Sequence, residues 1–574
     1  MKKTFLLSCL MLAAMPVMAA YTGHVYVDKN KNGVFDQSEK PLAGIKVSDG
    51  LNVVETAADG SFTLPGHERE RFIFITTPSG YKTFNRHYHK IEKKQSGYDF
   101  GLIPYSGRIR KDGSHRYIHI TDTEIFNTEN HADWVNNVHD YARNEQAAFI
   151  IHTGDLCYEK GLKAHIKLMN TENMDCPVFY CIGNHDLVKG KYGEELFESI
   201  YGPVYYSFDA GNVHYVVTPM PGGDHAPGYT SDDVCRWLKN DLAHIRPGTP
   251  VVVFNHDLLT YEDTFIFKSK NAGSINLNEY NLKAWVYGHW HINYMKKQGD
   301  VYSVCTSSLD KGGIDHSTTA FRVMHVDSKG DFTSELRYTY LDKNICIASP
   351  AGVMASGVLP VAVNVYSSVS PVREVLYTCL ADGKPVLKNK RLLQSTDWSW
   401  NGELPLSHKY VGKELTLRVT ARFNNGEIAE AESNFICRTE KTVPLFSADW
   451  DNLSGNAKHS APVSAPLNLP LQLAWTNNVG ANLYMTSPLI HKGKVIVASV
   501  DEDLKGAGHV YALNGKDGTI LWSCPVRNSI KNSIAVDSDI VFAQDAQGFL
   551  YAIDTETGKL CWEKQLPVNG LPAL

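Results

Sequence analysis

Residues 149–158, FIIHTGDLCY, pass directly from an apolar run into polar residues, and this change indicates the class of fold. The first half of this stretch, 149–153, is a short apolar run of the kind that forms a buried strand, and glycine and aspartate follow at once. Four other stretches place polar residues at the end of an apolar run in the same way: TDTE (121–124), GNHD (183–186), NHD (255–257) and GHWH (288–291). Since catalytic groups of α/β proteins usually lie where strands end in loops, we predict that these stretches form one dinuclear metal site.

Apolar runs alternate with helical patterns around these stretches. Helical spacing of apolar residues covers 132–146 and 231–245, and Ser231 is the expected N-cap of the second helix. We therefore predict an α/β domain over 108–330, with its motifs at strand ends. The predicted strands are 117–121, 149–153, 178–182, 213–218, 251–255 and 285–288.

Length and composition limit the class of protein. A chain of 574 residues exceeds one hydrophobic core and suggests about three to five domains. Its 43% hydrophobic and 21% charged residues are ordinary for globular proteins. The formal net charge of −6, with no basic cluster in the sequence, argues against a nucleic-acid partner.

The N-terminus has the three parts of a secretory signal peptide. Lys2 and Lys3 precede an apolar run over 5–17, and small residues follow up to Ala20. We predict a signal peptide over 1–19 and export of the mature protein to the periplasm or the cell exterior. No later segment of the sequence is long and apolar enough to predict a transmembrane helix.

Residues 20–105 have the alternating pattern of a small β-sandwich, interrupted by a polar loop over 28–39. This loop, DKNKNGVFDQSE, matches the twelve-residue calcium loop at each side-chain ligand position and at the central glycine. The alternative is a polar hairpin turn, because the loop follows a strand rather than a helix. The stretch resembles the calcium-bearing B-type repeats of bacterial surface adhesins, which implies one structural calcium ion. The predicted ligands are Asp28, Asn30, Asn32, the main chain of Val34, Asp36 and Glu39.

Residues 345–440 alternate between apolar and polar positions, with a hairpin turn at 424–426. This pattern predicts an immunoglobulin-like β-sandwich without catalytic groups. Cys379 and Cys437 lie on predicted strands, where they either join the two sheets by a disulfide or stay as buried thiols.

The C-terminal region, 445–574, contains an internal repeat. YALNGKDGTILW begins at Tyr511 and YAIDTETGKLCW at Tyr551, a shift of forty residues. These two segments resemble the repeats of quinoprotein-type propellers, although no quinone-binding residues are identified. Because propellers usually close with about four or more blades, we expect an incomplete propeller. A truncated sequence is the favoured explanation, and completion of the ring by another copy is the alternative.

The order and spacing of the strand-end stretches resemble those of the calcineurin-like metallophosphoesterases over about 108–326. The resemblance implies a four-layer α/β/β/α sandwich, flanked in this chain by β-sandwiches and a partial β-propeller. It also implies two transition metals, manganese, iron or zinc, with Asp155 as the bridging ligand. Asn184, His256 and His289 would complete one metal site, and Asp122 and His291 would serve the other.

The resemblance further implies that His185 contacts the phosphate and assists the leaving group, with Asp186 helping to orient its ring. One position departs from the family, which commonly has His where this chain has Glu124. Either Glu124 replaces that ligand, or Tyr158 does, since GDLCY also fits the GDxxY motif of purple acid phosphatases. In that subgroup the tyrosine binds ferric iron.

These features together predict an exported hydrolase. The resemblance implies hydrolysis of small phosphate monoesters or diesters by a metal-bound hydroxide. The alternative is a non-catalytic scaffold of the cell envelope with a degenerate phosphoesterase domain, because most predicted domains are β modules without evident chemistry. Self-association through the propeller blades is a less favoured prediction.

Overall fold

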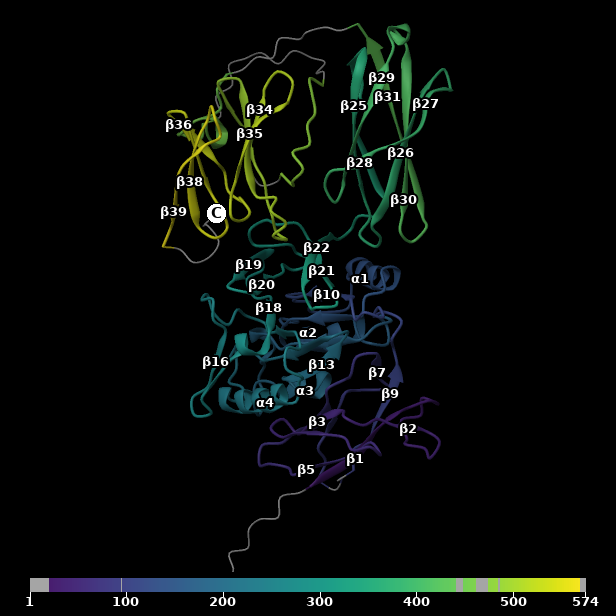
Figure 1. Ribbon diagram of the computed structural model, residues 1–574, viewed down its shortest axis with the longest axis vertical. Coiled ribbons are helices and arrows are strands. Elements are labelled where there is room, and N and C mark those ends of the chain that lie inside the picture. Colours follow the sequence, from purple (N-terminus) through teal and green to yellow (C-terminus); the bar gives the residue numbers. More distant parts are fainter. Residues whose placement is uncertain are drawn as a thin grey trace, which may run out of the picture.

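The structure is a computed structural model that describes residues 20–93, 95, 97–439, 448–460, 473–483 and 486–567. The predicted signal peptide, 1–19, lies outside the described residues. Figure 1 shows the N-terminal strands at one end, an α/β region in the middle, and two further β regions side by side at the other end. No helix in the described part of the chain is long and apolar enough to cross a membrane.

The central region contains two mixed sheets. The first has the strand order β12-β11-β10-β21-β22 and the second β13-β14-β15-β18-β20-β19. The strands of the first are β10 (His115–Ile120), β11 (Phe149–His152), β12 (Val178–Tyr180), β21 (Ala320–Val326) and β22 (Phe332–Tyr338). Those of the second are β13 (Tyr206–Ala210), β14 (Val213–Val217), β15 (Val251–Phe254), β18 (Leu282–Tyr287), β19 (Tyr294–Gln298) and β20 (Val301–Cys305).

The two sheets pack face to face through aromatic side chains. Phe149 of β11 lies with its ring centroid 5.0 Å from that of Tyr215 in β14, and Tyr117 of β10 lies 5.7 Å from Phe254 in β15. Residues that alternate with these, such as Ile118, pack with the helix α1 (Ala132–Asn144) on the other face of the first sheet. The aromatic residues belong to the largest hydrophobic core in the described part of the chain.

Three further helices complete this region. They are α2 (Tyr158–Leu168), α3 (Glu195–Tyr201) and α4 (Ser231–Ala243). Thr230, not Ser231, is the N-cap of α4, because its hydroxyl accepts a hydrogen bond from the Asp233 amide and the Asp233 carboxylate accepts one in return. The prediction of Ser231 as the cap is therefore wrong by one residue. Shorter elements are η1 (Asn184–Asp186), β16 (Ile266–Lys268), β17 (Ser274–Asn276) and η2 (Leu277–Tyr280).

The strand-end stretches are gathered by parallel pairing. β10, β11 and β12 run parallel in one sheet, and β14, β15 and β18 run parallel in the other. All five stretches follow strands of these two sets, so their side chains meet at one edge of the two sheets.

The N-terminal region has two small sheets around one core. A β-bridge between Thr77 and Phe208 joins it to the central region. One sheet contains β1 (Tyr21–Val27), β2 (Lys40–Pro41), β5 (Ser61–Leu64), β7 (Tyr81–Thr83) and β9 (Phe100–Pro104). The other contains β3 (Lys46–Ser48), β4 (Val53–Glu55), β6 (Phe72–Ile75) and β8 (Tyr88–Lys90).

The third region is a β-sandwich with its own core. Cys379 on β26 and Cys437 on β31 lie in the same sheet with β30 between them, so a disulfide that joins the two sheets is ruled out, and both thiols are free and buried. One sheet contains β23 (Asn344–Ser349), β25 (Gly357–Tyr366), β28 (Leu393–Gln394) and β29 (Ser399–Leu406). The other contains β24 (Gly352–Ala355), β26 (Val372–Ala381), β27 (Lys384–Arg391), β30 (Glu414–Phe423) and β31 (Ile428–Arg438), and η3 (His408–Tyr410) is a short turn.

The last region, here called the repeat unit, contains two four-stranded antiparallel sheets that correspond to the two sequence repeats. Trp522 of the first sheet donates its indole N–H to the Thr555 carbonyl of the second at 2.9 Å, which fixes one sheet against the next. The sheets contain β32 (Leu489–His491), β33 (Lys494–Ala498), β34 (His509–Asn514) and β35 (Ile520–Pro525), then β36 (Ala535–Asp537), β37 (Ile540–Gln544), β38 (Phe549–Asp554) and β39 (Leu560–Gln565). A short turn, η4 (Leu453–Gly455), precedes them.

Candidate metal centre

The strand ends turn sharply into the site. Six of the predicted ligand residues adopt the left-handed backbone region, which non-glycine residues occupy seldom. Gly183 is needed here for a different reason, since a Cβ atom on it would lie 2.2 Å from Asp155 Oδ1. The six residues are Asp122 (φ 50°), Glu124 (φ 43°), Asp155 (φ 58°), Tyr158 (φ 56°), His289 (φ 64°) and His291 (φ 51°).

Asp155 lies at the centre of the cluster. Its Oδ1 accepts a hydrogen bond from the His185 amide at 3.0 Å, and its Oδ2 lies 3.2 Å from His256 Nε2. Asp155, His256 and His289 each offer a ligand atom, and these atoms lie within 4.8 Å of one another. The carboxylate that the sequence predicts as the bridge is thus surrounded by the predicted nitrogen ligands.

Two buried polar atoms in this cluster have no hydrogen-bond partner among the described residues. His256 Nδ1 donates to the Thr153 carbonyl at 2.7 Å, and its buried Nε2 faces Asp155 Oδ2 at 3.2 Å without the geometry of a hydrogen bond. The side-chain oxygen of Asn184 is buried and unpaired as well. Such unpaired polar atoms cost free energy unless a partner satisfies them. Imidazole nitrogens and a carboxylate within 4.8 Å of one another, with a buried amide oxygen on the neighbouring turn, are ligand types that fit a transition-metal ion.

Asp122 and His291 form the other half of the cluster. Asp122 is fully buried, and its Oδ1 lies 3.4 Å from His291 Nε2. Glu124 Oε1 lies 3.8 Å from the same nitrogen, while its Oε2 is held by Lys311 Nζ at 2.8 Å. A ligand atom of Glu124 also lies within 4.8 Å of one of Asp155. Glu124 therefore belongs to the cluster and is held in place by a lysine.

Tyr158 occupies a different place. It is the first residue of α2, its side chain is 44% exposed, and its ring centroid lies 5.4 Å from that of His185. Of the two residues that could replace the missing histidine, Glu124 lies close to the predicted ligands Asp155 and His291, and Tyr158 lies beside His185.

His185 is oriented by Asp224 rather than by Asp186. His185 Nδ1 lies 2.9 Å from Asp224 Oδ2, across 39 residues of sequence. Asp186 instead is fully buried and accepts backbone hydrogen bonds at 2.9 to 3.0 Å from Gly183, Asp155 and Cys157. The prediction that Asp186 orients the His185 ring is wrong, because both oxygens of the Asp186 carboxylate accept hydrogen bonds from backbone amides of the loops after β11 and β12.

The charges of the cluster shift the pKa values of its members in the metal-free molecule. Burial lowers the pKa of His256, but Asp155 outweighs this effect and raises it to about 10. For His185, partial burial also lowers the pKa, and the hydrogen bond to Asp224 and the nearby carboxylates raise it above its ordinary value. A field this negative attracts cations.

Sequence reasoning missed Cys157 as part of the cluster. A ligand atom of this buried cysteine lies within 4.8 Å of ligand atoms of Glu124 and Asp155. Burial and the neighbouring Asp155 carboxylate raise the pKa of its thiol, so it is neutral in the metal-free molecule. The sequence did offer one indication that Cys157 lies near the site, which is its position inside the GDLCY stretch, two residues after Asp155.

The predicted calcium loop folds back on itself. Asp28 is buried and accepts hydrogen bonds from the Asn32 and Gly33 amides at 3.1 and 2.9 Å. Asn30 donates to Asp36 at 2.7 Å, and Glu39 accepts from the Lys29 amide at the same distance. The predicted ligands are close together, and calcium binding at this loop stays a prediction.

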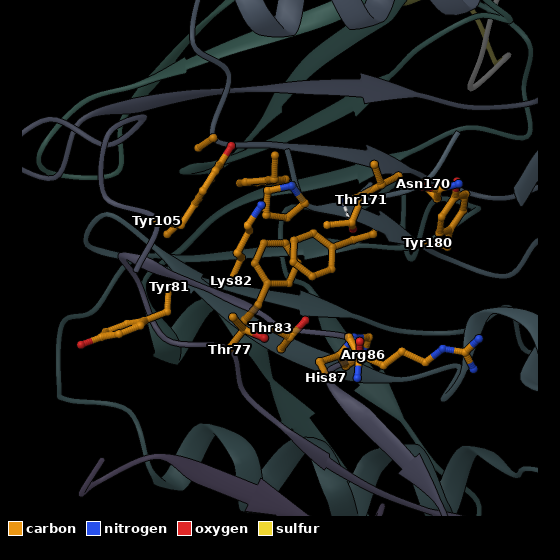
Figure 2. Close-up of a pocket in the computed structure, with 18 of the residues that line it drawn as sticks. Thr77, Tyr81, Lys82, Thr83, Arg86, His87, Tyr105, Asn170, Thr171 and Tyr180 are labelled. Atoms are coloured by element: carbon orange, nitrogen blue, oxygen red, sulfur yellow. Dashed lines mark hydrogen bonds between the residues drawn. The ribbon is translucent and has the colours of Figure 1, made fainter. Parts of the chain in front are cut away.

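A separate cavity of about 300 Å³ lies between the N-terminal and central regions (Figure 2). It is lined by Lys82, Arg86 and His87 from the N-terminal side and by Phe149 and Val178, which begin β11 and β12. The predicted metal ligands follow the opposite ends of these strands, so this cavity is not part of the metal centre.

Comparison with known families identifies the central region. Residues 115–293 match the model described as calcineurin-like phosphoesterase. The central domain is a calcineurin-like phosphoesterase domain. Residues 29–104, where the sequence resembles adhesin repeats, match the model for the N terminal of calcineurin-like phosphoesterase, and 472–571 match that of outer membrane protein assembly factor BamB. The resemblance of the phosphoesterase domain to its superfamily is confirmed, and that superfamily uses a dinuclear metal centre.

Individual relatives are distant. The chain is 26% identical over 215 residues to purple acid phosphatase 13 of Arabidopsis thaliana, an alignment that covers 35% of this chain and 36% of that protein. The chain therefore spans about a third of the length of this curated relative.

Three solved structures resemble parts of the chain. A predicted phosphoesterase of Streptococcus pneumoniae is 10% identical, with 40% of this chain and 98% of that chain covered and a TM-score of 0.19. BamB of Moraxella catarrhalis is 11% identical, with 44% and 59% covered and a TM-score of 0.13. The quinohemoprotein alcohol dehydrogenase ADHIIG of Pseudomonas putida HK5 is 20% identical, with 20% and 19% covered and a TM-score of 0.18.

Proposed function

We propose that the protein is an exported, metal-dependent phosphoesterase that hydrolyses small phosphate monoesters or diesters with two transition-metal ions. The observation that carries the proposal is the pair of buried, unpaired polar atoms beside Asp155, the oxygen of Asn184 and Nε2 of His256. In a phosphoesterase domain, one ion of the metal pair would be the partner of both atoms.

The ligands divide into two sets around Asp155. Asn184, His256 and His289 would hold one metal, and Asp122, His291 and Glu124 the other. When bound, the metals would neutralise the charge of the phosphate and activate a water as nucleophile. The ion pair with Lys311 keeps Glu124 Oε2 occupied, so Oε1, which lies 3.8 Å from His291 Nε2, is the oxygen free for a metal.

His185 would assist the leaving group. Its Nδ1 is engaged by Asp224 at 2.9 Å, and its side chain is 34% exposed, so Nε2 is left to meet a substrate. A protonated ring could give its Nε2 proton to the leaving oxygen as the ester bond breaks. Asp224 stabilises that protonated ring and fixes its orientation.

The purple acid phosphatase relative supports a second assignment, in which Tyr158 is a ligand to ferric iron. The relative is 26% identical over only part of its length. In the structure Tyr158 is 44% exposed and lies beside His185. We therefore assign the ligand position to Glu124, and absence of the purple charge-transfer colour from the iron-loaded protein would agree with this assignment.

Metal analysis combined with activity tests the proposal. We expect Asn184→Ala to lose bound metal and the hydrolysis of p-nitrophenyl phosphate and bis(p-nitrophenyl) phosphate, because it removes a predicted ligand. Asn425→Ala, an exposed asparagine in a distant hairpin, is the matched control and should behave like the unmodified protein. An unmodified protein with neither bound transition metal nor hydrolysis of either ester would instead support the non-catalytic scaffold.

A further inference from the structure

Buried charged side chains join the repeat unit to the phosphoesterase domain. Lys531 of the repeat unit is 2% exposed, and its ammonium group donates to Asp315 at 2.7 Å, to Glu502 at 2.8 Å and to the Asn293 carbonyl at 2.9 Å. Asp315 and Asn293 belong to the phosphoesterase domain, whereas Glu502 belongs to the repeat unit. A lysine is buried in this way only where several partners compensate for its desolvation.

This lysine supports the loop that carries His291. Asn293, whose carbonyl it binds, lies two residues after His291 in the chain. Asp315, its other partner, follows Ile314, whose amide donates to the His291 carbonyl at 2.9 Å. Lys531 therefore holds both segments that fix the backbone of this predicted metal ligand.

Arg322 forms a second connection. This arginine is fully buried in β21 and donates to Asp503 of the repeat unit at 2.6 Å. Its Nε donates to the Thr306 hydroxyl at 3.0 Å, and Thr306 Oγ1 lies 2.8 Å from His119 Nδ1. The repeat unit thus reaches a buried histidine of β10 through three successive hydrogen bonds.

The connection continues to the metal centre. His119 Nε2 lies 2.8 Å from the Thr153 hydroxyl, and the Thr153 carbonyl accepts from His256 Nδ1 at 2.7 Å. That last hydrogen bond fixes the ring of His256 and leaves its Nε2 for a metal. Partners of this kind, one step beyond the ligands, set ligand orientation and metal affinity.

We propose that Lys531 and Asp503 of the repeat unit are positioning residues for the dinuclear centre of the phosphoesterase domain. This inference rests on the proposed function, because it needs the cluster to bind metals. Lys531 acts on the loop of His291, and Asp503 acts through Arg322, Thr306 and His119 on Thr153 and His256. The repeat unit is then a structural part of the metal centre as well as a separate module.

The test is a titration of the full-length, metal-free protein with cobalt(II), followed by visible absorption and by competition with a chelator. We expect Lys531→Met to weaken cobalt binding about 10-fold and to change the ligand-field spectrum. This is the lower end of the 10- to 100-fold that loss of a direct partner of a ligand commonly costs, because Lys531 holds the loop of His291 rather than its ring. Lys531→Arg keeps the charge and should restore most of the affinity. Lys516→Met, on the exposed surface of the same unit, is the control and should match the unmodified protein.

Thr306→Val tests the connection through Arg322, Thr306 and His119 without changing a charge or the repeat unit. If Lys531→Met does not fold, this variant decides whether the proposed positioning role holds. It should weaken cobalt binding while the near-ultraviolet circular dichroism stays native. Unchanged affinity and spectrum in folded Lys531→Met and Thr306→Val would overturn the inference alone. Failure of the unmodified protein to bind cobalt would overturn the proposed function, and the inference with it.

Discussion

Asp224 approaches His185 from the loop between β14 and α4, far from the GNHD stretch in sequence. The contact of 2.9 Å is close enough to set the ring orientation. Asp186, next to His185 in the chain, is instead fully committed to three backbone amides. Adjacency in sequence therefore misled the assignment of the orienting carboxylate, because a residue and its neighbour in a short helical turn point in different directions.

We expect the His185→Asn variant to lose turnover in a way that depends on the leaving group. General acid catalysis typically contributes about 10²- to 10⁴-fold, and a poor leaving group such as an alkyl alcohol needs it more than p-nitrophenol does. The kcat for an alkyl phosphate should therefore fall much further than the kcat for p-nitrophenyl phosphate, at unchanged metal content. Asp224→Asn should show the same selectivity with a smaller loss. Equal losses for both substrates would contradict the role of His185 as acid.

At the scale of single elements, short apolar runs were the most reliable signal. Strands such as β11 and β15 lie within the predicted ranges 149–153 and 251–255 because their side chains are buried on both faces. α2 could not be predicted in the same way. Its buried face consists of Gly161, Leu162, Ala164 and His165, of which only Leu162 is a large apolar residue, whereas the buried faces of α1 and α4 contain several.

Thr230 and Ser231 are neighbouring hydroxyl residues that look equivalent in sequence, but only Thr230 is the N-cap of α4. We expect Thr230→Ala to lower the free energy of unfolding by about 1 kcal/mol, since it removes the hydroxyl that accepts from the Asp233 amide. Ser231→Ala is the matched control and should have little effect, because Ser231 is the first residue of the helix rather than its cap. Urea unfolding of both variants measures the difference. A larger loss for Ser231→Ala would contradict the assignment of the cap.

At the scale of the whole molecule, His214 connects the N-terminal region to the phosphoesterase domain. Its ring nitrogens lie 2.8 Å from Asp241 and 2.7 Å from Asp209, and Lys46 of β3 approaches Nδ1 to 3.4 Å. Burial lowers the pKa of His214, and Lys46 adds to that effect. The attraction of Asp241, with hydrogen bonds to both carboxylates, outweighs them and raises the pKa above its ordinary value.

This shift makes the stability of the molecule depend on pH. The raised pKa means that the folded state favours protonated His214, so its stabilisation is complete below the unfolded pKa of about 6.5 and is lost as the pH rises through the folded value. We expect the urea midpoint of the unmodified protein to fall more steeply above pH 6.5 than that of His214→Gln. His408→Gln, an exposed histidine of the β-sandwich, should follow the unmodified protein. Parallel curves for His214→Gln and the unmodified protein would rule out this contribution.

Contacts between regions were beyond the reach of sequence analysis. The family and the set of strand-end residues followed from local patterns, because Asp155 and Asn184 each come directly after an apolar run. Lys531 and Asp315 are 216 residues apart, and each looks like an ordinary surface residue in its own segment. Only the folded chain shows that they form a buried ion pair beside the metal centre.

The left-handed backbone of six predicted ligand residues has a consequence for engineering. Each non-glycine residue in that region costs about 1 kcal/mol relative to glycine, so replacement of the partly exposed His291 by glycine would relax the chain while it removed a ligand. Selection of variants for heat resistance alone would therefore reward loss of the site. A thermostabilisation programme would need to screen for metal content and turnover in the same round, because here robustness and catalysis favour opposite residues.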